Sequence, residues 1–208
     1  MTLPAPYYQD KYITLYCGDC REIVPEFTEM FDLLLTDPPY GLGIAANPFR
    51  QKFNPQSWDN RAASLDALMS GVNITKQQII WGGNFFALPP SQGFLVWDKI
   101  QPQDFSSAMC EQAWWSEHSP AKIHRERVTS YSKEHPTQKP LALMKWCIQL
   151  AGDVKTILDP FAGSGTTGRA AKDLGLKCTL IEREKKYCEI IARRMAQEVF
   201  DFSNLKGV

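Results

Sequence analysis

The sequence lacks several features that would assign it to a specialised class of protein. None of its apolar runs is long enough to cross a membrane. The first residues, MTLPAPYYQDKY, lack the basic and then apolar segments of a signal peptide, which predicts a cytoplasmic protein. Lys plus Arg equals Asp plus Glu, so the net charge of zero gives no sign of a strongly basic nucleic-acid binder. There is no internal repeat and no low-complexity tract.

Cysteine and histidine are too scattered to indicate a disulfide scaffold or a metal centre. The 6 cysteines have no regular spacing, which suits a reducing compartment. Cys17 and Cys20 form a C-x-x-C, but no second Cys or His pair follows at the spacing of a zinc ribbon. The surrounding ITLYCGDCREIV is typical of a strand that enters a turn, whereas a redox pair usually begins a helix. A zinc or redox role for this pair is therefore the less favoured alternative.

Apolar, β-prone runs alternate with helical patterns, which predicts an α/β domain with a mostly parallel sheet. Runs such as DLLLT and CTLIE are continuously apolar, as expected for strands buried on both faces. The length of 208 residues fits a single domain over 1–208. We predict strands at 12–17, 31–36, 77–82, 94–98, 156–159 and 177–181, and helices at about 64–72, 140–151, 165–174 and 184–200.

Two segments do not follow this alternation. Residues 43–61 are rich in Asn, Pro and Gly, and so long a loop in a compact domain is usually functional or disordered. Residues 100–135 are polar and basic with interleaved aromatics, and we interpret them as an insertion on the sheet. Within it, Trp114 and Trp115 are expected to be core residues rather than ligand contacts.

Positive charge is concentrated in residues 122–139, where five basic and two acidic side chains leave a net charge of +3. Such a segment could contact phosphates through Lys122, Arg125 and Arg127. The alternative is that it is only a solvated face.

The stretch LLLTDPPYGLG, at 33–43, ends an apolar run with an acid, two prolines and a tyrosine. A plain turn is one interpretation, because Asp-Pro and Pro-Pro both break regular structure. Each proline also fixes its own φ and removes a donor, and the residue before a proline is kept out of the helical region. Asp37 and Pro38 both precede a proline, so the turn should stay extended, with carbonyls able to face a ligand.

A second motif, ILDPFAGSGTTGRAAKDLG, has the pattern of a strand, a glycine turn and a helix. Gly163, Gly165 and Gly168 fit G-x-G-x-x-G, and the next strand, KCTLIE, ends in Glu182. Small residues allow a nucleoside to approach the backbone, and a carboxylate at the next strand's end can accept two bonds from a ribose diol. A tight turn without a ligand is the alternative. A Walker P-loop is excluded because no Lys precedes Thr166.

Three motifs in a fixed order make the chain resemble the DNA amino-methyltransferases, and in particular their β-class order. They are TDPPYG at 36–41, HPTQKP at 135–140 and DPFAGSGTT at 159–167, with GDC at 18–20 upstream. The resemblance spans about residues 12–190. It implies a Rossmann-like methyltransferase fold with a mostly parallel twisted sheet, helices on both faces and a circularly permuted motif order. It also implies S-adenosylmethionine as cofactor, DNA as substrate, and target recognition by a short insertion around 100–135.

The same resemblance implies roles for individual residues. Asp37, Pro38, Pro39 and Tyr40 would be the catalytic tetrapeptide. The Asp37 carboxylate and the Pro38 carbonyl would accept bonds from the two N–H groups of a base amine, which localises its lone pair. Tyr40 would stack on a base that has left the duplex. The implied cofactor contacts are Asp19 (to the adenine amine), Cys20, Asp37, Thr137, Lys139, Asp159, Phe161, Gly163, Ser164, Gly165, Thr166 and Glu182 (to the ribose).

The target atom and the partners are less closely determined. Aspartate at the first tetrapeptide position is associated mostly with adenine N6, and serine with cytosine N4, so Asp37 favours adenine N6. Arg50 and Lys52, in the loop at 43–61, could close over the flipped nucleotide. Whether a companion restriction enzyme accompanies the protein is open, and so is the oligomeric state, a homodimer included. The rival functions are a protein glutamine methyltransferase, an NAD-dependent oxidoreductase and a catalytically silent DNA-binding module.

Overall fold

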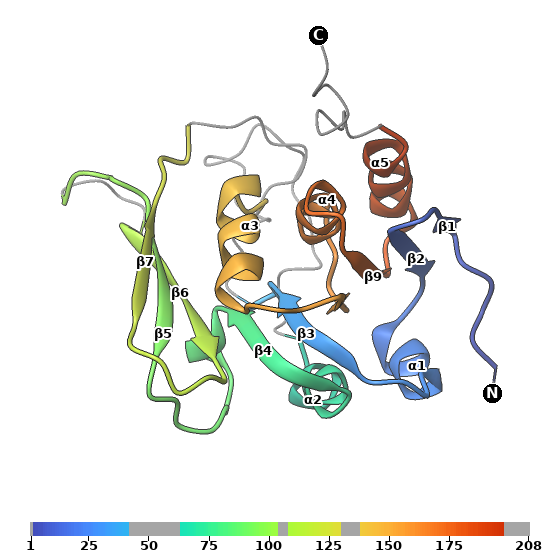
Figure 1. Cartoon of the computed structure of the whole chain (residues 1–208), viewed down its shortest axis with the longest axis horizontal. Helices are drawn as coiled ribbons and strands as arrows, with labels where there is room; N and C mark the ends of the chain where they lie inside the picture. The colour runs from blue at the N-terminus through green and yellow to red at the C-terminus, as the bar shows by residue number, and fades with distance from the viewer. Residues whose placement is uncertain (1, 42–62, 104–107, 130–137, 198–208) are drawn as a thin grey trace, which may run out of the picture.

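The computed structural model describes residues 2–41, 63–103, 108–129 and 138–197. They form a sheet of nine strands in the order β1-β2-β9-β8-β3-β4-β6-β5-β7, flanked by helices (Figure 1). The strands are β1 (Tyr8–Gln9), β2 (Ile13–Cys17), β3 (Phe31–Thr36), β4 (Thr75–Trp81), β5 (Phe94–Asp98), β6 (Cys110–Trp115), β7 (Lys122–Arg125), β8 (Thr156–Asp159) and β9 (Lys177–Glu182). The helices are α1 (Cys20–Ile23), α2 (Leu65–Asn73), α3 (Leu141–Leu150), α4 (Thr166–Asp173) and α5 (Lys185–Met195), with 3-10 turns η1 (Val24–Glu26) and η4 (Gly83–Phe85).

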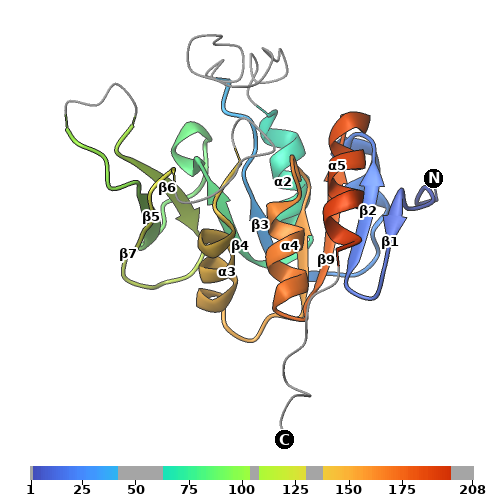
Figure 2. The same ribbon diagram turned by 90° about the horizontal axis from the view of Figure 1, so that it is seen from above.

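Helices cover both faces of the sheet, as predicted. Figures 1 and 2 show α3, α4 and α5 on one face, and α1 and α2 on the other. Successive residues of β3 point to opposite faces, so Leu33 and Leu35 join the core under α3 to α5. Leu34 joins the second core under α1 and α2. The continuously apolar run in this strand follows from that double burial.

The strand directions bring the predicted motifs to one edge of the sheet. Strands β2, β9, β8, β3 and β4 are mutually parallel, so they all end at this edge. β6 is antiparallel to β4 and to β5, and β5 is parallel to β7, so β5 and β7 end there too. We call this the carboxyl edge. Its strand-terminal residues are Cys17, Thr36, Trp81, Asp98, Arg125, Asp159 and Glu182.

Local sequence signals explain where the helices begin. The Ser64 hydroxyl accepts from Ala67 N (3.2 Å) and caps α2. Gly165 precedes α4 with φ 76°, a conformation that favours glycine. α5 ends at Met195, where the Ala196 N–H bonds Ala192 O, so the predicted end at 200 is wrong.

Residues 100–135 contribute two strands to the sheet, β6 and β7, which the sequence does not predict. Trp115 is in the core, as expected. Trp114 packs against the second core and donates from Nε1 to Pro89 O (2.8 Å). The loop predicted at 43–61 lies outside the described residues. Among the described helices, none is both long and apolar enough to span a membrane.

Candidate active site

The turn after β3 places Asp37 in a network of charged side chains that are buried or partly buried. Lys139, in the turn before α3, donates from Nζ to Asp37 Oδ2 at 2.5 Å. The same Nζ lies 3.0 Å from Glu111 Oε2 on β6, and the other Glu111 oxygen lies 2.6 Å from Lys99 Nζ. The Tyr40 hydroxyl donates to Asp37 Oδ1. Four segments that are distant in sequence therefore meet through alternating acidic and basic side chains at the carboxyl edge.

Burial and mutual attraction set the protonation of this network. Burial raises the pKa of Asp37 above its usual value, while Lys139 works in the opposite direction. Although burial disfavours its charged form, the carboxylates of Asp37 and Glu111 hold the pKa of Lys139 well above the usual range. Burial also works against the Glu111 carboxylate, but Lys139 and Lys99 lower its pKa to about 2. Lys139 is therefore a permanent cation between two carboxyl groups.

The Tyr40 ring is held close to the backbone that follows β4. Gly82 has φ 66°, and a Cβ added there would lie 2.0 Å from Tyr40 Cε1. The ring also stacks on Phe85 of η4, with centroids 5.0 Å apart and planes inclined by 21°. Burial, followed by the Asp37 charge, raises the pKa of Tyr40 well above its usual value, so its hydroxyl remains a donor to Asp37. The glycine at 82 is thus a requirement of the catalytic turn and not only of the strand end.

The glycine turn after β8 is tied to both neighbouring strands. The Asp159 carboxylate accepts from the Thr36 hydroxyl (2.7 Å) and from Phe161 N (3.1 Å), which fixes the turn beside β3. Glu182 accepts from Gly163 N (2.8 Å) with Oε2 and from Glu184 N (2.8 Å) with Oε1. Burial raises the pKa of Asp159 to about 6 and that of Glu182 to about 7. The carboxylate predicted to bind a ribose is therefore at the glycine turn, as the motif requires.

Three other residues that were predicted to contact the cofactor also make structural contacts within the protein. Asp19 caps α1 by accepting from Arg21 N (2.9 Å), and it also pairs with the Arg21 guanidinium. The Cys20 side chain is buried in the second core. Ser164 is buried and its carbonyl accepts from Arg194 (2.5 Å). Direct cofactor contact by Asp19, Cys20, Asp159, Phe161, Ser164 and Thr166 stays a prediction.

The structure separates Lys139 from the basic segment, while its predicted contact with the cofactor stays a prediction. The sequence places it both in the basic segment at 122–139 and among the cofactor contacts. Its side chain is only 6% exposed, so it does not belong to a solvated basic face. Its ammonium instead bonds Asp37, because a buried charge must be paired with an opposite one. Thr137, Arg50 and Lys52 lie outside the described residues.

Comparison with known proteins now identifies the family. The family model for DNA methylases of the N6/N4 type matches residues 79–193, more than half of the chain. The chain belongs to the N6/N4 DNA methylase family. The matched range includes the HPTQKP segment and the glycine motif.

Three similar proteins align with most of the length of this methylase. A type II methyltransferase, M2.MboI of Moraxella bovis, is 28% identical over 251 aligned positions, which cover 91% of this chain and 90% of the relative. The M1.HpyAVI–SAM complex aligns with 24% identity, a TM-score of 0.62 and coverage of 88% of this chain and 99% of that one. The cytosine-N4-specific PvuII DNA methyltransferase aligns with 15% identity, a TM-score of 0.66 and coverage of 97% and 92%. These structures confirm the predicted Rossmann-like methyltransferase fold.

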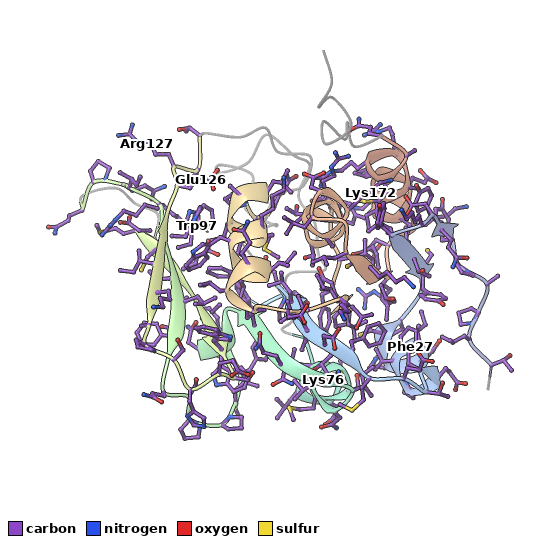
Figure 3. The ribbon with its side chains drawn as sticks, viewed as in Figure 1. Phe27, Lys76, Trp97, Glu126, Arg127 and Lys172 are labelled. Carbon is purple, nitrogen blue, oxygen red and sulfur yellow. The ribbon has the colours of Figure 1, made fainter. Side chains whose placement is uncertain are left out.

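The basic side chains predicted to contact phosphates lie at both ends of β7 of the methylase. Arg125 ends β7 at the carboxyl edge, where its Nε lies 3.2 Å from Asp98 Oδ2. Figure 3 shows Arg127 beyond it, next to Glu126, whose carbonyl accepts from Trp97 (2.8 Å). Lys122 begins β7 and therefore lies toward the opposite edge. Arg125 and Arg127 are thus on the side of the molecule that holds Asp37, and Lys122 is not.

Sequence reasoning missed Glu111, Lys99 and Phe85. Glu111 is in phase with Ala113 and Trp115 of β6, and both of these are buried. An acid at an inward position of a strand requires a partner. The sequence therefore indicates a paired Glu111 only if residues 110–115 are first recognised as a strand. Phe85 is 47% exposed although it is apolar, and no pattern in the sequence connects it with Tyr40.

Proposed function

We propose that this methylase transfers a methyl group from S-adenosylmethionine to adenine N6 in DNA. The observation that carries the proposal is the position of Asp37. Its carboxyl group belongs to the predicted tetrapeptide at the carboxyl edge and is bonded to Lys139 and Tyr40. The neighbouring strand carries the glycine turn, which the Thr36–Asp159 bond ties to β3. A cofactor bound at this turn and a base held by Asp37 would therefore be neighbours.

The residues at the glycine turn suit the cofactor. Gly163 and Gly165 have φ of 56° and 76°, a backbone conformation that favours glycine and shapes the turn. Each Glu182 oxygen accepts one backbone N–H, which leaves a second lone pair on each for a ribose hydroxyl. When bound, S-adenosylmethionine supplies a methyl group on a positively charged sulfur.

Asp37 and its neighbours provide what an amine needs to act as a nucleophile. The lone pair of an exocyclic amine is delocalised into the ring, so acceptors on its N–H bonds favour the tetrahedral form. Both Asp37 oxygens are already bonded, but a carboxylate oxygen can accept more than one hydrogen bond. The Pro38 carbonyl would be the second acceptor. Tyr40 offers its ring to a flipped base, and the positions of these groups supply orientation, which can account for much of the barrier.

Adenine N6 is favoured over cytosine N4 by the first residue of the tetrapeptide. Asp37 matches the acid found mostly in adenine-specific relatives of this family. Cytosine N4 is the second candidate, because either base presents an amine to the same acceptors. The structural likeness to the cytosine-N4-specific PvuII enzyme concerns the fold alone.

Transfer of label from S-adenosylmethionine to DNA tests the proposal. Purified protein is incubated with methyl-labelled S-adenosylmethionine and DNA of mixed sequence. We expect the label in DNA with the parent protein and none with Asp37→Ala, while calorimetry shows that the variant still binds the cofactor. A parent protein that binds the cofactor and labels no DNA would overturn the proposal.

A further inference from the structure

Lys139 is shared between two carboxylates, and only one of them is in the predicted tetrapeptide. Its Nζ lies 2.5 Å from Asp37 and 3.0 Å from Glu111. Glu111 is in turn held by Lys99 through its other oxygen. The chain of charges therefore runs from the catalytic turn, through Lys139 and Glu111, to a lysine just after β5.

Removal of the amine proton would disturb this balance of charge. In the proposed reaction, an N–C bond forms at the base and the C–S bond of the donor breaks, with its electron pair left on sulfur. The methylated nitrogen must then release a proton, and Asp37 is the acceptor placed to receive it before solvent does. Protonated Asp37 is neutral, so Lys139 would lose its counter-ion there. An unpaired buried cation is strongly unfavourable.

We propose that Glu111 is a positioning residue for methyl transfer, which acts through Lys139. The Glu111 carboxylate remains a counter-ion for the Lys139 ammonium while Asp37 gains and loses a proton, so that Lys139 stays in place. Glu111 also adds a negative charge near Asp37, which makes Asp37 a better proton acceptor. This inference rests on the proposed function of Asp37.

The charge on Glu111 should therefore set the pH at which activity is lost. The titratable groups that face Asp37 are Tyr40 in the same turn, Glu111 on β6, Lys139 before α3 and Asp159 on β8. Negative charge on Glu111 raises the pKa of Asp37, so Glu111→Gln should lower that pKa. The acidic limb of kcat against pH should then move to lower pH. We expect kcat itself to fall roughly tenfold, because Asp37 becomes a weaker base and Lys139 depends on it alone.

Lys99 allows a test with the opposite sign. Lys99 pairs with Glu111 and partly neutralises it, so Lys99→Gln leaves more negative charge near Asp37. The acidic limb should then move to higher pH. Disturbed packing alone would not shift the limb in opposite directions in the two variants. The KM for S-adenosylmethionine should stay within about twofold of the parent in both, because neither residue lies at the glycine turn.

The experiment measures the rate of DNA labelling at saturating cofactor across pH for the parent, Glu111→Gln, Glu111→Asp and Lys99→Gln. Glu117→Gln, an exposed acid just after the same strand, is the matched control and should behave as the parent does. Glu111→Asp keeps the negative charge, so the acidic limb of its kcat against pH should match that of the parent even if its rate falls.

Two results would overturn the inference. One is an acidic limb in Glu111→Gln that matches that of the parent. The other is a shift of the same sign in Glu111→Gln and Lys99→Gln. If the parent protein labels no DNA, the result contradicts the proposed methyl transfer itself and not the role of Glu111 within it. If Glu111→Gln does not fold, Lys99→Gln alone decides by the direction of its shift.

Discussion

Three acids at the carboxyl edge, Asp37, Asp159 and Glu182, share a pKa raised by burial. They differ in their partners. Asp37 has a lysine, whereas Asp159 and Glu182 accept from hydroxyl or backbone N–H groups. The Lys139 ammonium favours the charged form of Asp37, whereas Glu182 has only neutral donors and its pKa reaches about 7. The roles of these acids follow from their partners more than from their residue type.

Affinity for S-adenosylmethionine should fall as the pH falls through about 7, the raised pKa of Glu182. Below this pH the free protein carries a proton on Glu182, and that proton must leave before both oxygens can accept ribose hydroxyls. Each pH unit below the pKa can cost up to about tenfold in affinity. Calorimetric titration at pH 6 to 8 measures this dependence.

Glu182→Gln provides the comparison. It should lose about 1.5–3 kcal/mol of binding free energy at pH 8, because charge-assisted bonds are lost. Its affinity should vary little with pH. Glu189→Gln, which removes an exposed acid on α5, should keep the parent dependence. If Glu182→Gln shows the parent's pH dependence, another group is responsible.

Substitutions of Tyr40 separate its ring from its hydroxyl. Tyr40→Phe removes a donor to Asp37 but keeps the ring and its stack on Phe85, so we expect substantial activity. Tyr40→Ala should lose about 1–3 kcal/mol of base stacking. The ratio of kcat/KM for DNA in the two variants measures this difference. Equal losses would show that Tyr40 works through its hydroxyl.

At the scale of the elements, β4 and η4 hold the catalytic turn. Gly82→Ala would place a Cβ 2.0 Å from the Tyr40 ring, at a φ of 66°. We expect DNA labelling to be lost while cofactor affinity is retained. Gly152→Ala is the matched control, because its φ is 80° and its Cβ would have no neighbour within 4 Å. Both variants should lose about 1–3 kcal/mol of unfolding free energy from backbone strain. If Gly152→Ala lost as much activity, strain and not the collision would be the cause.

The end of β7 is the element expected to meet DNA phosphates. Neutralising Arg125 and Arg127 should reduce the slope of log affinity against log salt by about 0.9 for each lost contact. Lys122→Gln, at the other end of the same strand, should leave the slope unchanged because Lys122 lies toward the opposite edge. Binding titrations over a range of salt concentrations measure the slopes. If the variant with both arginines neutralised keeps the salt slope of the parent, this end of β7 is only a solvated face.

At the scale of the whole molecule, the sequence predicts the parallel strands well because each is a buried apolar run with a motif at its end. β3, β8 and β9 are the clearest cases. β6 and β7 were missed because their polar residues hide a short alternation, and only β7 of the two is an edge strand. The pairing of Lys139 with Glu111 was not predicted, for a related reason. Its partner Glu111 is 28 residues away in sequence, and local patterns carry no information about such a pairing.

The identity of the labelled nucleoside decides whether this methylase acts on adenine N6 in DNA. DNA methylated by the parent protein with labelled S-adenosylmethionine is digested to nucleosides and separated by chromatography. We predict that the label elutes with the N6-methyladenine nucleoside. Label found only on cytosine would end the adenine assignment, and a protein that binds the cofactor but labels no nucleoside would contradict the proposed reaction.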